Sequence, residues 1–123
     1  MSYDIDLCDP VTRGVLQLDA AHHMRGGTFC VGGTTNATLK VTYNYTRFFG
    51  NVGNNGIRSI CGKTGAESIP MLTAAINSLG DDVDPDYWKP TAGNAKKALI
   101  QLRTLAQMRP DGVWSIDGHW TNV

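Results

Sequence analysis

The chain has 123 residues, and its eleven basic and eleven acidic side chains give a formal net charge of zero. This length predicts one domain with one hydrophobic core. A chain without net positive charge does not have the basic surface that binding of a nucleic acid polymer requires. No apolar run is long enough to cross a bilayer and no signal-like segment opens the chain, so we expect a cytoplasmic protein with no membrane partner.

The first half of the sequence predicts β-strands. Tyr3, Ile5 and Leu7 alternate with acidic residues, which is typical of a half-buried strand. A turn at 9–14 leads into a returning strand at 15–18, and glycine pairs enclose a short strand at 28–31. The clearest strand is 37–45, where apolar and polar residues alternate. Four strands with short links predict an antiparallel sheet.

The second half predicts helices. A short helix is expected at 46–52. A longer one begins between Thr64 and Ser68 and ends at Leu79, since Pro70 favours a place in the first turn. Thr91 caps a last helix that reaches about Met108.

We therefore predict an α+β fold, in which a small antiparallel sheet in the N-terminal half is covered by two main C-terminal helices. The chain forms a single domain, 1–123, that is mainly β over 1–45, mainly helical over 46–110, and ends in a tail at 111–123. The tail is too apolar for a free terminus, so it packs across the sheet or meets a second subunit.

Residues 56–70 run from a short apolar segment through a glycine turn into the start of a helix. Lys63 and Thr64 in this turn, with Arg58 upstream, predict a cradle for an anion made by backbone N–H groups. The glycine spacing of a P-loop is missing, because Ile57 stands where that loop needs glycine. The alternative is structural: Thr64 and Glu67 match a capping box.

Catalytic signals are weak. His22 and His23 are adjacent and point to opposite sides of an extended segment, and the carboxylates gathered at 81–86 suit turns and solvation. Three cysteines without metal-binding spacing are read as buried apolar residues in a reducing compartment. We expect neither an enzyme nor a metal or cofactor site. The cysteines are Cys8, Cys30 and Cys61.

Ligand binding has better support. Arginine offers the paired donors that phosphates favour, asparagine reads a base edge or a ribose hydroxyl, and aromatic rings stack on bases. For each of these residues the alternative is ordinary packing or capping, and for Arg109 it is a cation at a helix C-terminus. The candidates are Arg25, Arg58, Lys63, Thr64, Tyr87, Trp88, Asn94, Arg109 and Asp111.

Several short motifs resemble those of one group of small phage proteins. They are Arg-Gly-Gly-Thr at 25–28, Val-Gly-Gly-Thr-Thr at 31–35, Thr-Tyr-Asn-Tyr at 42–45, Gly-Lys-Thr-Gly-Ala-Glu-Ser-Ile-Pro at 62–70, Gly-Asn-Ala-Lys at 93–96 and Met-Arg-Pro-Asp-Gly at 108–112. The chain resembles the first Thoeris anti-defence family over nearly its whole length. Members of that family are viral sponges that sequester the cyclic ADP-ribose signals made by bacterial TIR proteins, and some also sequester cyclic oligonucleotide signals of the CBASS system.

The resemblance implies a homo-oligomer, either a dimer or a dimer-based hexamer, with ligand pockets near subunit interfaces. It places Arg58, Asn94, Arg109 and Asp111 around the cyclic ADP-ribose signal. A stacking phenylalanine of the family has no certain counterpart here, so Tyr87 or Trp88 takes its place. A second site for cyclic di- or trinucleotides would involve His23, Arg25 and Gly26.

Two other functions compete with this non-catalytic sponge. One is a phage structural or host-protein-binding module that uses the sheet edge and the aromatic tail and has no small-molecule ligand. The other is a small nucleotide-cleaving enzyme, which the lack of a metal-ligand set or a base–nucleophile pair in the sequence disfavours.

Overall fold

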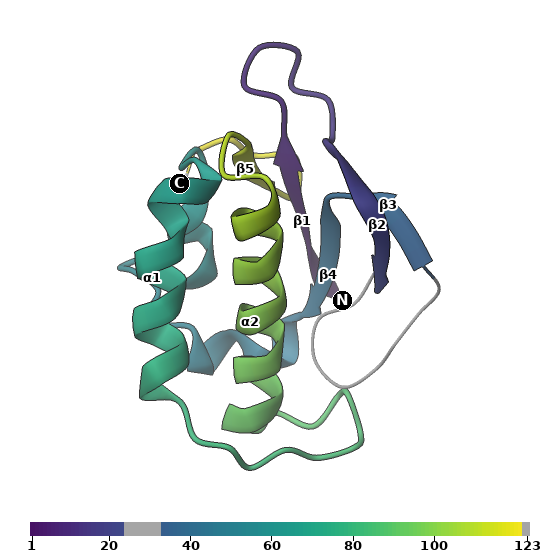
Figure 1. Ribbon diagram of the computed structural model, residues 1–123. Helices are drawn as coiled ribbons and strands as arrows, with labels where there is room; N and C mark the ends of the chain where they lie inside the picture. Colours follow the sequence, from purple (N-terminus) through teal and green to yellow (C-terminus); the bar gives the residue numbers. More distant parts are fainter. Residues whose placement is uncertain (24–32, 122–123) are drawn as a thin grey trace.

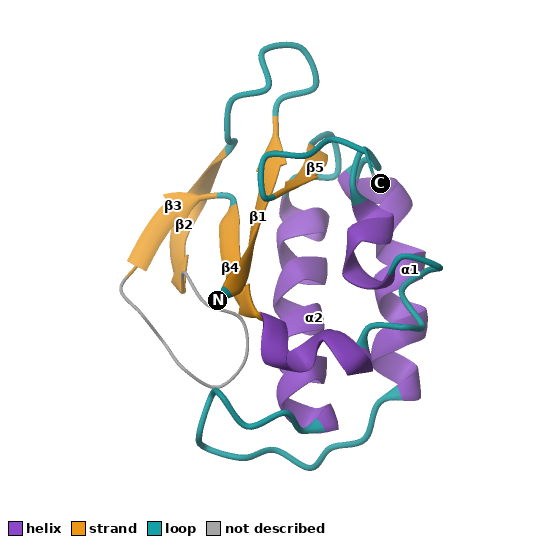
Figure 2. Ribbon diagram, turned by 180° about the vertical axis from the view of Figure 1, so that it is seen from behind, coloured by secondary structure: helices purple, strands orange, loops and turns teal. Residues whose placement is uncertain are grey.

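The computed structural model describes residues 1–23 and 33–121. This part of the chain is an α+β fold, as the sequence predicts, with antiparallel strands followed by two main helices. Figures 1 and 2 show the two helices side by side, with the strands along one flank of the second helix. The predicted strand at 28–31 lies outside the described residues.

The central strand β1 (Ser2–Cys8) lies between β4 (Thr38–Thr42) and β5 (Val113–Ile116), antiparallel to both. Its apolar residues Ile5 and Leu7 are fully buried, which confirms the predicted alternation. β4 is shorter than predicted. Thr42 ends it, because its hydroxyl accepts the Asn44 N–H and caps a 3₁₀ helix, η1 (Tyr43–Phe48).

A second, two-stranded sheet joins β2 (Gln17–His23) to β3 (Gly33–Asn36). The hairpin predicted from β1 closes only at its base, where Cys8 pairs with Val15. Beyond that point Leu16 donates its N–H to Leu7 and accepts one from Ala37, and the two sheets diverge. β2 therefore leaves the main sheet, and its first residue, Gln17, accepts a hydrogen bond from Arg109, the C-cap of the last helix.

The helices are α1 (Gly65–Ser78) and α2 (Ala92–Met108), preceded by a second 3₁₀ helix, η2 (Gly56–Ile60). Thr64 caps α1 in a complete capping box with Glu67, and Thr91 caps α2. Ser68 is therefore not the cap, and Pro70 lies in the second turn rather than the first. The apolar residues that recur at helical spacing along α2 are buried: Ala95, Ala98, Leu99, Leu102, Leu105 and Ala106.

The tail is part of the core rather than an appendage. β5 pairs along β1, and the Trp114 side chain is fully buried, with its indole N–H donating to the Ser68 hydroxyl at 2.7 Å. Asp117 and Gly118 then form a tight turn with positive φ at both residues, closed by two hydrogen bonds between Ile116 and His119. An Asp-Gly pair is the usual sequence of such a turn.

Cys8 and Cys61 are buried free thiols, as expected, and burial raises the pKa of each. Cys30 lies outside the described residues. Over those residues the structure contains no helix long and apolar enough to cross a membrane.

Candidate functional site

The start of α1 does not provide the predicted anion cradle. Gly65 donates its N–H to Gly112, and Ala66 donates to Pro110. The Glu67 N–H donates to the Thr64 hydroxyl, and the Thr64 N–H to the Glu67 carboxylate. Because these donors are used within the protein, Thr64 is a capping residue here, which is the structural alternative that the sequence left open.

The Gly-Lys-Thr-Gly motif instead anchors the segment that follows α2. A Cβ on Gly65 would lie 2.7 Å from the Arg109 carbonyl oxygen and 3.0 Å from Pro110 Cα, so only glycine allows this approach. The Lys63 carbonyl accepts the Trp114 N–H, which ties the same turn to β5. The turn thereby holds the segment 110–114, next to Arg109, through backbone contacts.

Arg109 is held in one orientation by three hydrogen bonds. Its Nε and one terminal nitrogen donate to the two Asp111 oxygens at 3.1 and 2.9 Å, and its other terminal nitrogen donates to the Gln17 carbonyl at 3.0 Å. The hydrogen bond to Asp111 is the main cause of a raised Arg109 pKa, and Asp19 adds to it. Three of the five guanidinium N–H groups are thus used in contacts with described residues, and two remain for a ligand.

A groove runs between β2 and the C-terminal half of α2. Its polar end is a cavity of about 430 Å³, lined by Gln17, Leu18, Asp19, Met108 and Arg109. The fixed guanidinium offers donors there, while Asp19 offers acceptors. An arrangement of both kinds within one cavity suits a ligand that carries hydroxyl groups as well as anionic oxygens.

Asn94 is a structural residue and not part of this groove. Its side chain is fully buried, and its oxygen accepts the Asp84 N–H at 2.9 Å. Its amide nitrogen donates to the carbonyls of Asp86 and Lys89. The sequence predicts that Asn94 reads a ligand, but in this structure its side chain holds the 84–89 connector against the start of α2.

Replacing Asn94 by alanine should lower stability rather than ligand affinity alone. The change removes three hydrogen bonds made by a fully buried side chain and leaves the Asp84 N–H without this partner, which costs about 2–4 kcal/mol in the free energy of unfolding. Urea denaturation measures this loss, with Asn44→Ala as the control, because Asn44 makes an exposed hydrogen bond to the Trp88 carbonyl. Equal stability of the two variants would contradict the structural role.

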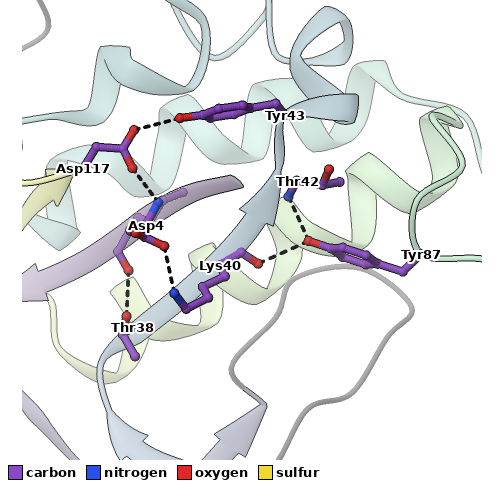
Figure 3. Close-up of polar contacts among 8 residues, drawn as sticks. Asp4, Thr38, Lys40, Thr42, Tyr43, Tyr87 and Asp117 are labelled. Atoms are coloured by element: carbon purple, nitrogen blue, oxygen red, sulfur yellow. Dashed lines mark hydrogen bonds and ion pairs between the residues drawn. The ribbon is translucent and has the colours of Figure 1, made fainter. Parts of the chain in front are cut away.

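Tyr87 is also buried, and it joins the connector to β4. Its hydroxyl accepts the Thr42 N–H at 2.8 Å (Figure 3). The Tyr87 ring packs edge-on against Trp88. Tyr87 is thus unable to stack on a ligand, since only 2% of it is exposed. Trp88 is 47% exposed but lies with Asn94 at the N-terminal end of α2. That end is about 22 Å along the helix from Arg109.

Arg58 belongs to a third location. Its guanidinium forms an ion pair with Asp117 at 2.7 Å and lies over the Tyr3 ring. Asp117 also accepts the Asp4 N–H and the Tyr43 hydroxyl (Figure 3). Within one chain, therefore, Arg58, Asn94 and Arg109 do not form one pocket. Arg109 lines the cavity of about 430 Å³, and Asp111 contacts its guanidinium.

The cluster around Asp117 predicts acid-sensitive stability. Burial alone would raise the Asp117 pKa, but hydrogen bonds from the Asp4 N–H and from Arg58 lower it overall. A carboxylate with a lowered folded-state pKa stabilises the protein above its unfolded pKa of about 3.9, and the stabilisation is lost as pH falls through the folded value.

The Asp117→Asn variant, which keeps a residue tolerant of positive φ, should therefore melt below the natural protein at pH 7. The difference should shrink toward zero as the pH falls from about 3.9 through the lowered pKa of folded Asp117. Melting curves from pH 7 to pH 2 test this, with Asp4→Asn as the control for an exposed ion pair to Lys40. A difference that does not change with pH would contradict it.

The second predicted site falls mostly outside the described residues. Arg25 and Gly26 are not described, and for His23 the structure gives the backbone at the end of β2, where it pairs with Gly33. Among residues 1–23 and 33–121, no group of three or more His, Cys, Asp or Glu side chains could hold a metal ion.

Sequence reasoning missed Gln17, Asp19 and Met108 as lining residues, and it missed Asp117 as the partner of Arg58. The Asp-Gly pair at 117–118 is typical of a tight turn, and the Asp117 carboxylate in this turn is the partner of Arg58. No local signal marks the groove, because β2 and α2 are far apart in the sequence.

No known protein family matches the chain, and neither a curated protein nor a solved structure shows significant similarity to it.

Proposed function

We propose that this protein binds a cyclic nucleotide of the ADP-ribose class and holds it without chemical change, acting as a sponge for a bacterial immune signal. The observation that carries the proposal is the Arg109 guanidinium, fixed by Asp111 and Gln17 beside a cavity of about 430 Å³. The resemblance to the first Thoeris anti-defence family supplies the ligand class. The site of action would be the cytoplasm of an infected bacterial cell.

The geometry of Arg109 favours binding of a preformed, rigid ligand. An arginine already held in place loses little side-chain entropy when a ligand arrives, and a cyclic nucleotide likewise loses little on binding. Asp111 uses both oxygens to hold Arg109, so its role in this proposal is to position the guanidinium. The remaining N–H donors of Arg109 would meet a ligand phosphate or carbonyl oxygen.

Calorimetric titration with cyclic ADP-ribose, followed by heating and chromatography of the released ligand, tests the proposal. We expect saturable binding and recovery of all the ligand unchanged. A linear or hydrolysed product would contradict the non-catalytic assignment. An absence of binding to cyclic ADP-ribose and to its linkage isomers would contradict the ligand class and favour a module that binds a host or phage protein.

The sponge is further proposed to act as a homo-oligomer, either a dimer or a dimer-based hexamer. The two-stranded β2–β3 sheet stands apart from the main sheet, and a sheet of two strands has little stability alone. Sedimentation velocity at micromolar concentration should show at least a dimer. A folded monomer under those conditions would contradict this expectation.

A further inference from the structure

Asp19 is the residue beside Arg109 whose carboxylate is left to accept hydrogen bonds from a ligand. Asp19 and Gln17 both belong to β2 and line the cavity of about 430 Å³. The Gln17 amide is committed to β3, since its nitrogen donates to the Asn36 side-chain oxygen and its oxygen accepts the Thr35 hydroxyl. Among residues 1–23 and 33–121, none donates a hydrogen bond to the Asp19 carboxylate.

The other side chains around this cavity do not replace Asp19 as an acceptor. Leu18 is apolar, and the Met108 thioether accepts hydrogen bonds only weakly. The Arg109 guanidinium only donates, and both oxygens of Asp111 accept from it. The cavity therefore combines fixed donors from Arg109 with acceptors from Asp19.

The charge around Arg109 is mainly negative. The hydrogen bond to Asp111 is the largest cause of the raised Arg109 pKa, and the charges of Asp111, Asp19 and Asp9 add to it. The Asp9 carboxylate accepts backbone N–H groups of its own turn. One guanidinium thus lies among three carboxylates, so a ligand group that brings further negative charge next to Asp19 is repelled.

A smaller cavity between β2, β4 and α2 has a different chemistry. Its volume is about 120 Å³, and no Asp, Glu, Lys or Arg side chain lines it. A phosphate would lose its hydration there without gaining a charged partner, which is strongly unfavourable. The lining residues are His22, Leu39, Gln101, Thr104, Leu105 and Met108.

A ribose with its phosphate matches the donors and acceptors of the larger cavity. A hydroxyl group both donates and accepts, so it pairs with a carboxylate that has no other donor. In dinucleotide-binding folds an acidic residue accepts from a free ribose hydroxyl, whereas an arginine accommodates a phosphate at the same position. A carboxylate beside a ribose therefore distinguishes a free hydroxyl from a phosphorylated one.

We propose that Asp19 selects nucleotides with a free ribose hydroxyl, by accepting a hydrogen bond from that hydroxyl while Arg109 binds the adjoining phosphate. The inference rests on the proposed function and deepens it, because it names the residue that sets the specificity of that site. A ribose that carries a phosphate in place of this hydroxyl is rejected, since the phosphate is repelled by the carboxylate.

A thermodynamic cycle between the ligand hydroxyls and Asp19 tests the proposal. Calorimetric titration compares cyclic ADP-ribose with deoxy analogues that each lack one ribose hydroxyl. For the natural protein, at least one analogue should bind about tenfold more weakly, as expected when a hydrogen bond to a charged group is lost. For Asp19→Ala, that analogue and the parent ligand should bind within about twofold of each other.

The cycle separates the hydrogen bond from the general effect of charge, because removing the Asp19 charge acts alike on the two ligands. Asp6→Ala is the matched control, since Asp6 lies on β1 and lines neither cavity. This variant should keep the full difference between the parent ligand and the analogue. Melting curves establish that each variant is folded.

A phosphorylated ligand supplies an independent measurement. Cyclic ADP-ribose that carries a phosphate on the hydroxyl identified by the cycle should bind the natural protein about tenfold or more weakly than the parent ligand. Asp19→Asn should recover most of this loss, because its amide is neutral and donates hydrogen bonds to a phosphate.

The outcomes distinguish the two proposals. Binding that depends on Arg109, with the same losses for every deoxy analogue in the natural protein and in Asp19→Ala, would overturn the role of Asp19 and spare the proposed function. Equal binding of the phosphorylated and parent ligands to the natural protein would do the same. A failure of cyclic ADP-ribose and its isomers to bind at all would overturn both.

Discussion

The Trp114→Ala variant should lose about 3–5 kcal/mol in the free energy of unfolding, a fall in melting temperature of about 10–25 °C. Trp114 is fully buried in β5, and its indole N–H donates to the Ser68 hydroxyl near the start of α1. The substitution removes the largest buried side chain of the core and leaves a cavity between β5 and α1. Thermal melting followed by circular dichroism measures the effect.

Trp88→Ala is the matched control, because Trp88 is nearly half exposed and packs mainly against the edge of Tyr87. Its loss should cost no more than about 1.5 kcal/mol. The Trp114 effect should also be independent of protein concentration, since it comes from the core of one chain. Equal losses in the two variants, or a Trp114 effect that vanishes at high concentration, would show that the tail stabilises an intersubunit contact instead.

The Arg109→Ala variant should bind cyclic ADP-ribose about tenfold to a hundredfold more weakly, because it removes charged donors from the groove. Arg109 is at the C-terminal end of α2, where its backbone N–H still donates to Leu105 after substitution. The fold should therefore survive. Calorimetric titration measures the affinity, and melting curves establish that the variant is folded.

Arg103→Ala is the control for loss of charge, since Arg103 lies on the same helix, lines neither cavity and contacts Thr73. Its affinity should change by less than about twofold. Asp111→Asn should weaken binding less than Arg109→Ala, because Gln17 still holds the guanidinium through one hydrogen bond. If Arg109→Ala and Arg103→Ala have equal effects, the groove is not the ligand site.

Local sequence patterns predicted most of the secondary structure correctly. The alternation of apolar and polar residues in β1 and the apolar face of α2 can each be recognised from the sequence of that segment alone. Burial of one face imposes a period of two residues on a strand and of 3.6 residues on a helix. The capping box of Thr64 and Glu67 was also recognisable, but as one of two alternatives. Choosing between a cap and an anion site required knowing that residues 110–112 accept the N–H groups of Gly65 and Ala66.

The candidate site was only partly predictable for the same reason. Arg109 and Asp111 form a local pair two residues apart, so the sequence could indicate them together. Asn94 matched the chemistry of a ligand contact equally well, yet its partners at 84, 86 and 89 bury it. Residue type alone does not distinguish a polar side chain whose hydrogen bonds are all made inside the protein from one that faces a cavity.

The sequence by itself determined the α+β class and the positions of α1 and α2, since these depend on periodicity and capping within short segments. Only the tertiary structure decided that the tail forms β5, that Arg58 pairs with Asp117, and that a groove separates β2 from α2. Each of these depends on contacts between segments distant in the chain, and such contacts are chosen by packing of the whole core rather than by local preference.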